Sequence, residues 1–79
     1  KKIFLNKLNI LDNLETNNDN LLVKVRSTGK LLKAKVNLKG KNAEVNLNEN
    51  ETGISPGQAC VFYKKDRFGH KILGGGWVI

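Results

Sequence analysis

Methionine is absent from these 79 residues, and cysteine, proline, histidine and tryptophan occur once each. With one cysteine, Cys60, the chain can form no internal disulfide, and it lacks the second thiol and the spaced histidines of a zinc site. No apolar run approaches the ~20 residues that span a bilayer, and no leader-like segment is seen. We therefore expect a cytoplasmic protein without membrane association. Without a methionine the chain has no start residue, so we expect a fragment of a longer chain, the alternative being a processed protein.

Residues for catalysis are also scarce. His70 lies in a polar turn and is expected to be solvated, and Cys60 stands between two apolar residues with no adjacent cation to lower its pKa. We therefore predict that Cys60 is a small core residue. Residues 74–76 are three glycines followed by neither lysine nor serine, so they do not match a phosphate-binding loop. We predict that this fragment is non-catalytic and holds no metal, ATP or other cofactor.

Apolar and polar residues alternate along much of the chain with the period of two that is typical of strands with one buried face. The clearest segments are residues 21–25, 32–39 and 43–47. Turn residues at 27–30 and 40–42 separate them, which favours an antiparallel meander. Residues 3–11 predict an earlier strand. The asparagine-rich residues 12–20 are expected to form a surface loop.

The last third of the chain predicts two strands around a polar hairpin tip at residues 65–70. Residues 53–63 read Gly-Ile-Ser-Pro-Gly-Gln-Ala-Cys-Val-Phe-Tyr, in which Pro-Gly predicts a type II turn that starts a strand. Residues 72–79 read Ile-Leu-Gly-Gly-Gly-Trp-Val-Ile, where glycines allow a bend or the close approach of another backbone. We place Trp77 in the core, the alternative being an anchor that faces a partner. Together the segments predict an all-β, six- to seven-stranded antiparallel barrel forming one domain over residues 1–79.

The net charge of +7 is concentrated in one stretch, because residues 21–41 carry seven basic side chains and no acidic one. The first twenty residues and residues 42–79 are each balanced. Alternate residues of a strand point the same way about 6.6 Å apart, a spacing that suits successive phosphates. The candidate RNA-binding residues are Lys24, Arg26, Lys33, Lys35 and Lys39. Aromatic residues are absent there, so RNA would be held by its backbone. The alternative is a solvated outer face.

Residues 53–63 and 72–79 resemble the C-terminal β-barrel domain of bacterial tRNA-specific 2-thiouridylases, whose chains typically end in Pro-Gly-Gln-Ala-x-Val-Phe-Tyr and Leu-Gly-Gly-Gly-Trp-Ile strands. Residues 21–47 are compatible with this family, and residues 1–20 match it loosely. The resemblance implies a barrel like those of translation proteins, such as the second domain of elongation factor Tu. It also implies that the full-length protein is a tRNA-uridine 2-sulfurtransferase, which activates the wobble uridine with ATP in a PP-loop domain.

The same resemblance implies several partners for the longer protein: tRNA, the upstream PP-loop and central domains of the same chain, and a sulfur-carrier protein. The catalytic cysteines would lie outside this barrel, which would serve as an accessory domain that contacts tRNA. Where the family often has an Arg-Tyr-Arg-like run, this chain has Ser27-Thr28-Gly29. The alternatives are a generic RNA-binding barrel of a translation-related protein, or a protein-docking barrel without RNA contact.

Overall fold

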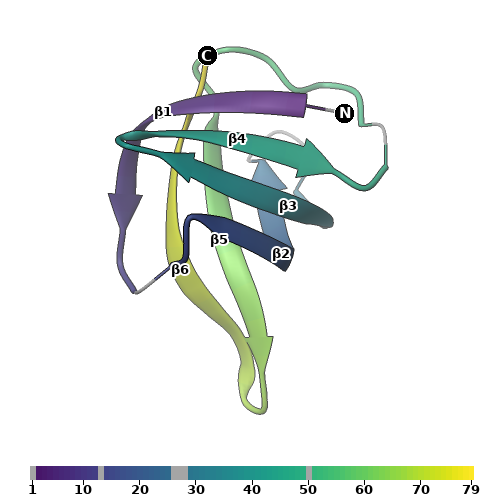
Figure 1. The fold of residues 1–79 in the computed structure, drawn as a ribbon. Coiled ribbons are helices and arrows are strands. Elements are labelled where there is room, and N and C mark those ends of the chain that lie inside the picture. Colours follow the sequence, from purple (N-terminus) through teal and green to yellow (C-terminus); the bar gives the residue numbers. More distant parts are fainter. Residues whose placement is uncertain (1, 13, 26–28, 50) are drawn as a thin grey trace.

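The alternating segments of the sequence form strands that close into a barrel (Figure 1). The computed structural model describes residues 2–12, 14–25, 29–49 and 51–79. The strands are β1 (Lys2–Ile10), β2 (Asn17–Val25), β3 (Leu31–Lys39), β4 (Asn42–Leu47), β5 (Ala59–Asp66) and β6 (Gly69–Val78). Every pairing is antiparallel, in the order β1-β4-β3-β2-β5-β6 with β6 returning to β1. The predicted all-β barrel is confirmed, and no described segment is a membrane-spanning helix.

The expectation of a surface loop over residues 12–20 is wrong in its second half, because β2 already begins at Asn17. Asn17 and Asn18 pair with β3, and the ladder then shifts register before Leu21. Asn20 has a φ of 58°, a left-handed conformation that asparagine tolerates better than most residues. A strand ladder uses backbone groups alone, so polar side chains that face solvent do not prevent it.

The barrel interior is filled by inward-facing aliphatic side chains around one aromatic ring. Phe62 is fully buried, with 0% of its surface exposed. The other buried residues are Ile3, Leu5, Leu21, Val23, Val25, Ala34, Val36, Ala43, Val45, Leu47, Cys60, Leu73 and Val78. They alternate with outward-facing residues along the strands, as the sequence predicts. Cys60 is fully buried among them, so its predicted place in the core is confirmed.

Trp77 does not lie in the core, contrary to our expectation. Its side chain is 48% exposed, whereas Gly76 and Val78 on either side of it are buried. Successive residues of a strand point to opposite faces, so an inward Val78 places the indole on the outer wall. Phe62 supplies the large aromatic group of the interior instead, where six short strands leave little room for a second one.

The glycines of β6 allow its backbone to lie directly against both neighbouring strands. A Cβ atom on Gly75 would overlap the carbonyl oxygen of Cys60 on β5. On the other side, a Cβ atom on Gly76 would lie 2.8 Å from the carbonyl oxygen of Asn6 on β1. These contacts occur where β6 joins β5 to β1, so they close the barrel. The predicted close approach of another backbone is confirmed.

Beyond the barrel wall, β5 and β6 continue as a two-stranded arm that projects from the body (Figure 1). β5 pairs with β2 only as far as Tyr63. Residues 64–66 then pair with residues 69–71 alone, and a two-residue turn joins them. We call residues 64–71 the hairpin arm. An ion pair between Lys71 Nζ and Asp12 Oδ2, at 2.5 Å, ties its base to the segment that follows β1.

Replacing Gly75 by alanine tests the role of the bare backbone in closure. The added methyl group overlaps main-chain atoms that cannot rotate away, so Gly75→Ala should lower the free energy of unfolding by about 3 kcal/mol. Gly57→Ala is the matched control, because Gly57 has a φ of 90° but no atom within 4 Å of the added Cβ. The control should lose only the ~1–2 kcal/mol of backbone strain. Equal losses in urea unfolding would contradict the steric explanation.

Candidate nucleic-acid interface

Four of the five predicted RNA-binding residues lie on the outer side of β2 and β3. We call Lys24, Lys33, Lys35 and Lys39 the basic face; all four are exposed. Lys24 pairs with Leu31 and Lys33 with Leu22, so Lys24 and Lys33 are diagonal neighbours across the two strands. Such neighbours are separated by about 7–8 Å. Arg26, the fifth predicted residue, lies outside the described residues.

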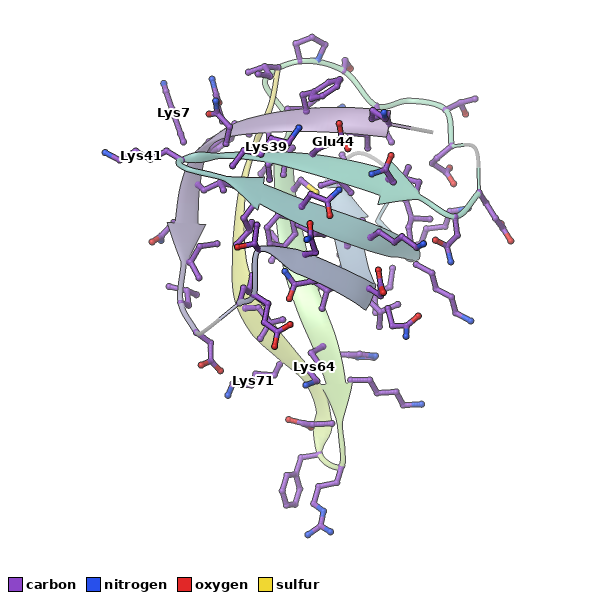
Figure 2. All side chains as sticks on the ribbon, viewed as in Figure 1. Lys7, Lys39, Lys41, Glu44, Lys64 and Lys71 are labelled. Carbon is purple, nitrogen blue, oxygen red and sulfur yellow. The ribbon has the colours of Figure 1, made fainter. Side chains whose placement is uncertain are left out.

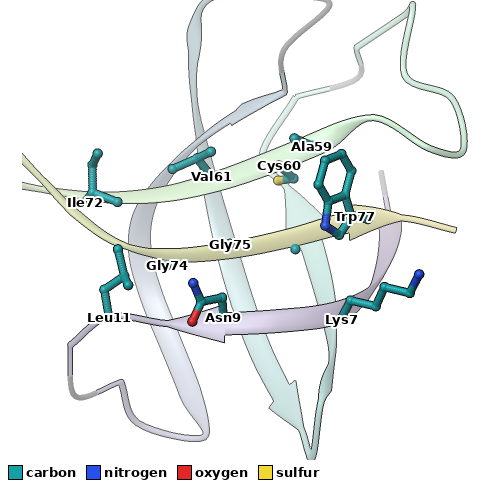
Figure 3. A pocket seen from close by; sticks show the side chains of 11 residues that line it. Lys7, Asn9, Leu11, Ala59, Cys60, Val61, Ile72, Gly74, Gly75 and Trp77 are labelled. Atoms are coloured by element: carbon teal, nitrogen blue, oxygen red, sulfur yellow. The ribbon is translucent and has the colours of Figure 1, made fainter.

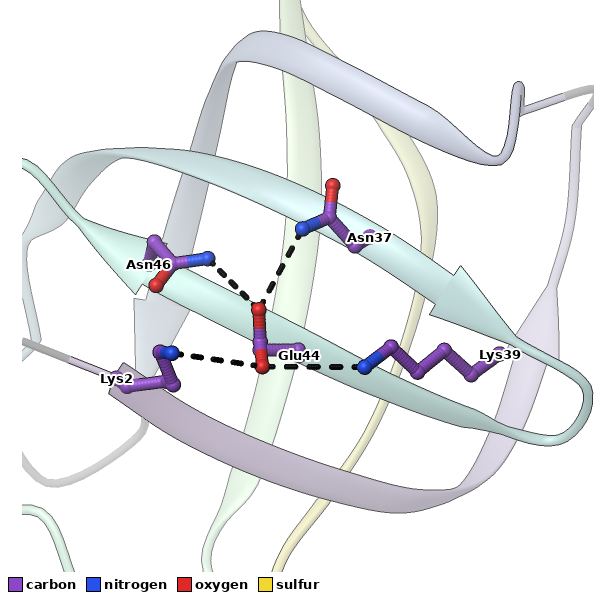
Figure 4. A network of polar contacts seen from close by, with 5 residues as sticks. All are labelled: Lys2, Asn37, Lys39, Glu44 and Asn46. Carbon is purple, nitrogen blue, oxygen red and sulfur yellow. Dashed lines mark hydrogen bonds and ion pairs between the residues drawn. The ribbon is translucent and has the colours of Figure 1, made fainter.

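Glu44 on β4 interrupts this positive surface (Figure 4). Its Oε1 atom lies 3.9 Å from Lys39 Nζ and 3.8 Å from Lys2 Nζ, and Asn46 and Asn37 donate hydrogen bonds to Oε2 at 3.2 and 3.5 Å. The hydrogen bond from Asn46, assisted by the two lysines and by Asn37, lowers the pKa of Glu44 despite partial desolvation. The carboxylate is therefore charged at neutral pH and offsets part of the charge of Lys39.

Ion pairs offset the charge of some lysines in residues 21–41, so fewer of these residues carry a free positive charge than the sequence predicts. Lys30 Nζ pairs with Glu51 Oε2 at 3.2 Å, while Lys39 shares Glu44. Within the described ranges, no carboxylate pairs with Lys24, Lys33 or Lys35. Sequence reasoning missed the two glutamates because they belong to the balanced half of the chain. Only strand register brings Glu44 opposite Asn37, beside Lys39.

Cys60 offers no accessible thiolate. Its side chain is enclosed by the barrel, and burial raises the pKa of the thiol to about 12. A thiolate is the nucleophilic form of cysteine, so this residue is unreactive where it lies. His70, the single histidine, is exposed on the hairpin arm. No group of three or more potential metal ligands occurs among the residues that the structure describes.

An apolar groove of about 330 Å³ lies on a different side of the barrel, across β1, β5 and β6 (Figure 3). Residues 74–76 form its floor, and Trp77, Ile72 and Leu11 rise around it. Lys7 is the one charged residue of its lining. The basic face and this groove thus lie on different strands of the outer wall. Exposed apolar patches of this kind often mark contact surfaces.

Comparisons with known proteins agree with this architecture. The family described as the aminomethyltransferase beta-barrel domain matches residues 1–78. The chain belongs to this family. No solved structure matches the chain.

Several relatives of this barrel family are named tRNA-specific 2-thiouridylase MnmA. The protein from Rhodospirillum centenum is 37% identical over 79 residues, which cover 99% of this chain and 19% of that protein. The Parvibaculum lavamentivorans protein is 46% identical over 59 residues, covering 75% of this chain and 14% of its own length. The Ruegeria pomeroyi protein is 52% identical over 59 residues, which cover 73% of this chain and 15% of that protein.

These matches confirm the resemblance to the C-terminal barrel domain of the 2-thiouridylase family. The chain spans only between 14% and 19% of the length of these three relatives. Their named activity therefore belongs to proteins several times longer than this barrel. The three relatives align over different extents of the chain, and one of them covers nearly all of it, including the strands that carry the basic face.

Glu44 should make stability depend on pH. Its pKa is lowered on folding from an ordinary value of 4.5, so its stabilising contribution is present above that value and is lost as the pH falls through the folded-state pKa. Glu44→Gln should thus destabilise the protein at neutral pH and bring little change in strong acid. Urea unfolding of both proteins over a pH series measures this. A constant difference at all pH values would mean that packing, and not charge, explains the loss.

Proposed function

We propose that this barrel is the tRNA-contacting accessory domain of an ATP-dependent tRNA 2-thiouridylase, which replaces the 2-oxygen of the wobble uridine with sulfur. The names of the relatives support the activity of the longer protein. In this proposal ATP binds in a PP-loop domain elsewhere in that protein. A sulfur-carrier protein supplies the sulfur, and the enzyme works in the cytoplasm.

The observation that best supports tRNA contact is the set of lysines on the basic face that no carboxylate of the described chain neutralises. Lys33 and Lys35 are alternate residues of β3, so their side chains emerge on one side about 6.6 Å apart. Lys24 extends the same surface onto β2. Lysines that neutralise phosphates release counterions and so favour binding without reading the base sequence. The barrel would therefore hold the tRNA backbone, and other parts of the enzyme would select the nucleotide.

The buried thiol supports an accessory role over a catalytic one. Cys60 is enclosed, and its raised pKa keeps it protonated at neutral pH, so it can neither attack an activated uridine nor accept sulfur. Sulfur transfer would use cysteines elsewhere in the longer protein.

The apolar groove favours a second role, docking to the rest of the same polypeptide. Relatives of this chain are several times longer, so further protein surface is covalently attached to the barrel in them. Covalent linkage raises the effective concentration of the partner, which lets a modest groove suffice for contact. The upstream PP-loop and central domains are the proposed occupants. This docking role is compatible with tRNA contact, because the basic face lies on other strands.

Reversing two charges tests the proposed tRNA contact. In the full-length enzyme, Lys33→Glu with Lys35→Glu should weaken tRNA binding and flatten its dependence on salt, by about one unit of slope for each phosphate that is no longer neutralised. Filter binding over a range of salt concentrations measures both quantities. Lys41→Glu, compared with Lys33→Glu alone, is the control of equal charge change, because Lys41 lies on the β3–β4 turn and outside the apolar groove (Figure 2). Equal effects of these two single reversals would contradict the proposal.

Glu44→Gln tests the opposite change, since it removes a negative charge beside the basic face and should strengthen tRNA binding. Removing the carboxylate frees Lys39 and Lys2, so tRNA should bind more tightly and with a steeper salt dependence, by up to about one unit of slope for each lysine that then meets a phosphate. Unchanged binding would remove Lys39 from the interface and leave Lys24, Lys33 and Lys35.

Cys60→Ala separates accessory from catalytic roles. In the full-length enzyme, this change should leave the rate of tRNA thiolation within a few-fold of the wild-type rate. It should cost at most ~1–2 kcal/mol of stability, because little volume is removed from the core. Thiolation assays and thermal melts on the same preparations provide both values. Loss of sulfur transfer with an intact fold would show that Cys60 takes part in the chemistry.

A further inference from the structure

The hairpin arm has a net positive charge, although residues 42–79 as a whole are neutral. All four basic residues of the balanced half of the chain lie in the arm: Lys64, Lys65, Arg67 and Lys71. Asp66 is the one acidic residue there, so the arm has a net charge of +3. The acidic residues that balance it along the chain are Glu44, Glu49 and Glu51, which lie on β4 or in the connection after it. In space, Asp12 pairs with Lys71 at the base of the arm and offsets one of these charges, so the projecting part keeps Lys64, Lys65 and Arg67 against Asp66, a net charge of +2 (Figure 2).

An aromatic ring stands at the tip of this arm. Phe68 is 90% exposed, the highest value among the exposed large apolar residues of the described chain. Its backbone N–H donates a hydrogen bond to Asp66 Oδ1 at 2.8 Å, which fixes the turn. The ring contributes nothing to the core, so folding gives no reason for an aromatic residue here. Arg67 precedes it and is also exposed.

The arm is continuous with the basic face. Lys33 on β3, Leu22 on β2 and Tyr63 on β5 are register neighbours across three adjacent strands. Neighbouring strands lie about 4.8 Å apart, so Lys33 and Tyr63 are roughly 10 Å from each other. Lys65 follows Tyr63 by two residues and emerges on the same side of β5. One extended ligand can therefore contact Lys33 and then follow the arm towards its tip.

We propose that the hairpin arm is a second RNA contact, in which the Phe68 ring stacks on an unpaired base while Arg67 and Lys65 bind the flanking phosphates. This inference rests on the proposed tRNA-binding function. Stacking on an aromatic side chain tolerates any base, because every base has a flat face. The contact thus recognises an unpaired nucleotide by its accessibility. It adds the aromatic element that the basic face lacks.

Charge favours RNA over the other ligands of an exposed aromatic tip. A protein partner for Phe68 would need an apolar pocket, yet the cationic Arg67 adjoins the ring and Lys64 and Lys65 lie on the strand that leads to it. An anionic membrane would also attract such a tip. RNA is favoured because the adjoining basic face supplies further phosphate-binding lysines on the same side of the molecule.

Titration of the full-length enzyme with tRNA tests the stacking contact. Phe68→Ala should weaken binding about five- to hundredfold, the range expected when one base–aromatic stack is removed, without changing the salt slope. Phe68→Tyr should bind like the wild type. Arg67→Ala should instead lower the slope by about one unit, since it removes a cation that binds a phosphate. Phe4→Ala, which removes an exposed aromatic side chain from β1, is the control and should not affect binding.

Fluorescence of a Phe68→Trp variant gives a direct reading of the same contact, since stacking on a base quenches indole emission. Both proteins in the comparison carry Trp77→Phe, which removes the one tryptophan of this chain, and only one of them also carries Phe68→Trp. The tryptophan at position 68 should be quenched by tRNA and not by vesicles of anionic lipid. Quenching by vesicles alone would overturn the proposal in favour of a membrane contact.

The outcomes separate this inference from the proposed function. If Phe68→Ala binds tRNA like the wild type while the Lys33 and Lys35 reversal weakens binding, the arm proposal is wrong and the tRNA-binding function stands. If neither change weakens binding, both are wrong. If Phe68→Ala, Phe68→Tyr and Phe4→Ala weaken binding equally, stacking at position 68 is excluded.

Discussion

Barrel closure depends on the contact between the bare backbone of β6 and the strands on either side of it. At Gly75 and Gly76 there is no room for a side chain against Cys60 on β5 or Asn6 on β1. With both contacts made, the ladder returns to β1 and the interior is sealed around Phe62. A domain of 79 residues has few other sources of stability, since its core is small and disulfides are impossible with one cysteine.

Closure also decides which chemistry each side of the wall presents. Strand geometry sends alternate residues to opposite sides, so one sequence supplies an aliphatic interior and two different exteriors. On β2 and β3 the outward residues include lysines, and on β5 and β6 they include Val61, Ile72 and Trp77. The polar and apolar surfaces thus follow from the parity of each strand. Neither surface requires a loop to position it.

The alternation of residues predicts most of the fold, and it also explains the errors. It correctly predicts most of the strands, the buried position of Cys60 and the four lysines on the outer side of β2 and β3. The size of Trp77 suggests a core residue, whereas parity relative to Val78 requires an outward one. The ion pairs of Glu44 and Glu51 depend on which residues become neighbours in space. The positive charge of the hairpin arm is cancelled when the charges of residues 42–79 are summed, because three glutamates precede it in the sequence. Single-sequence patterns carry no such information.

The projecting arm brings a hazard that the closed barrel avoids. Closure leaves the wall without free edges, but past Tyr63 each strand of the arm pairs only with the other in the described structure. Unpaired strand edges can template the addition of strands from other molecules, which leads to aggregation. Lysines at positions 64 and 65 oppose such association, because two arms would bring like charges together. The same lysines therefore oppose the pairing of this arm with the arm of a second copy.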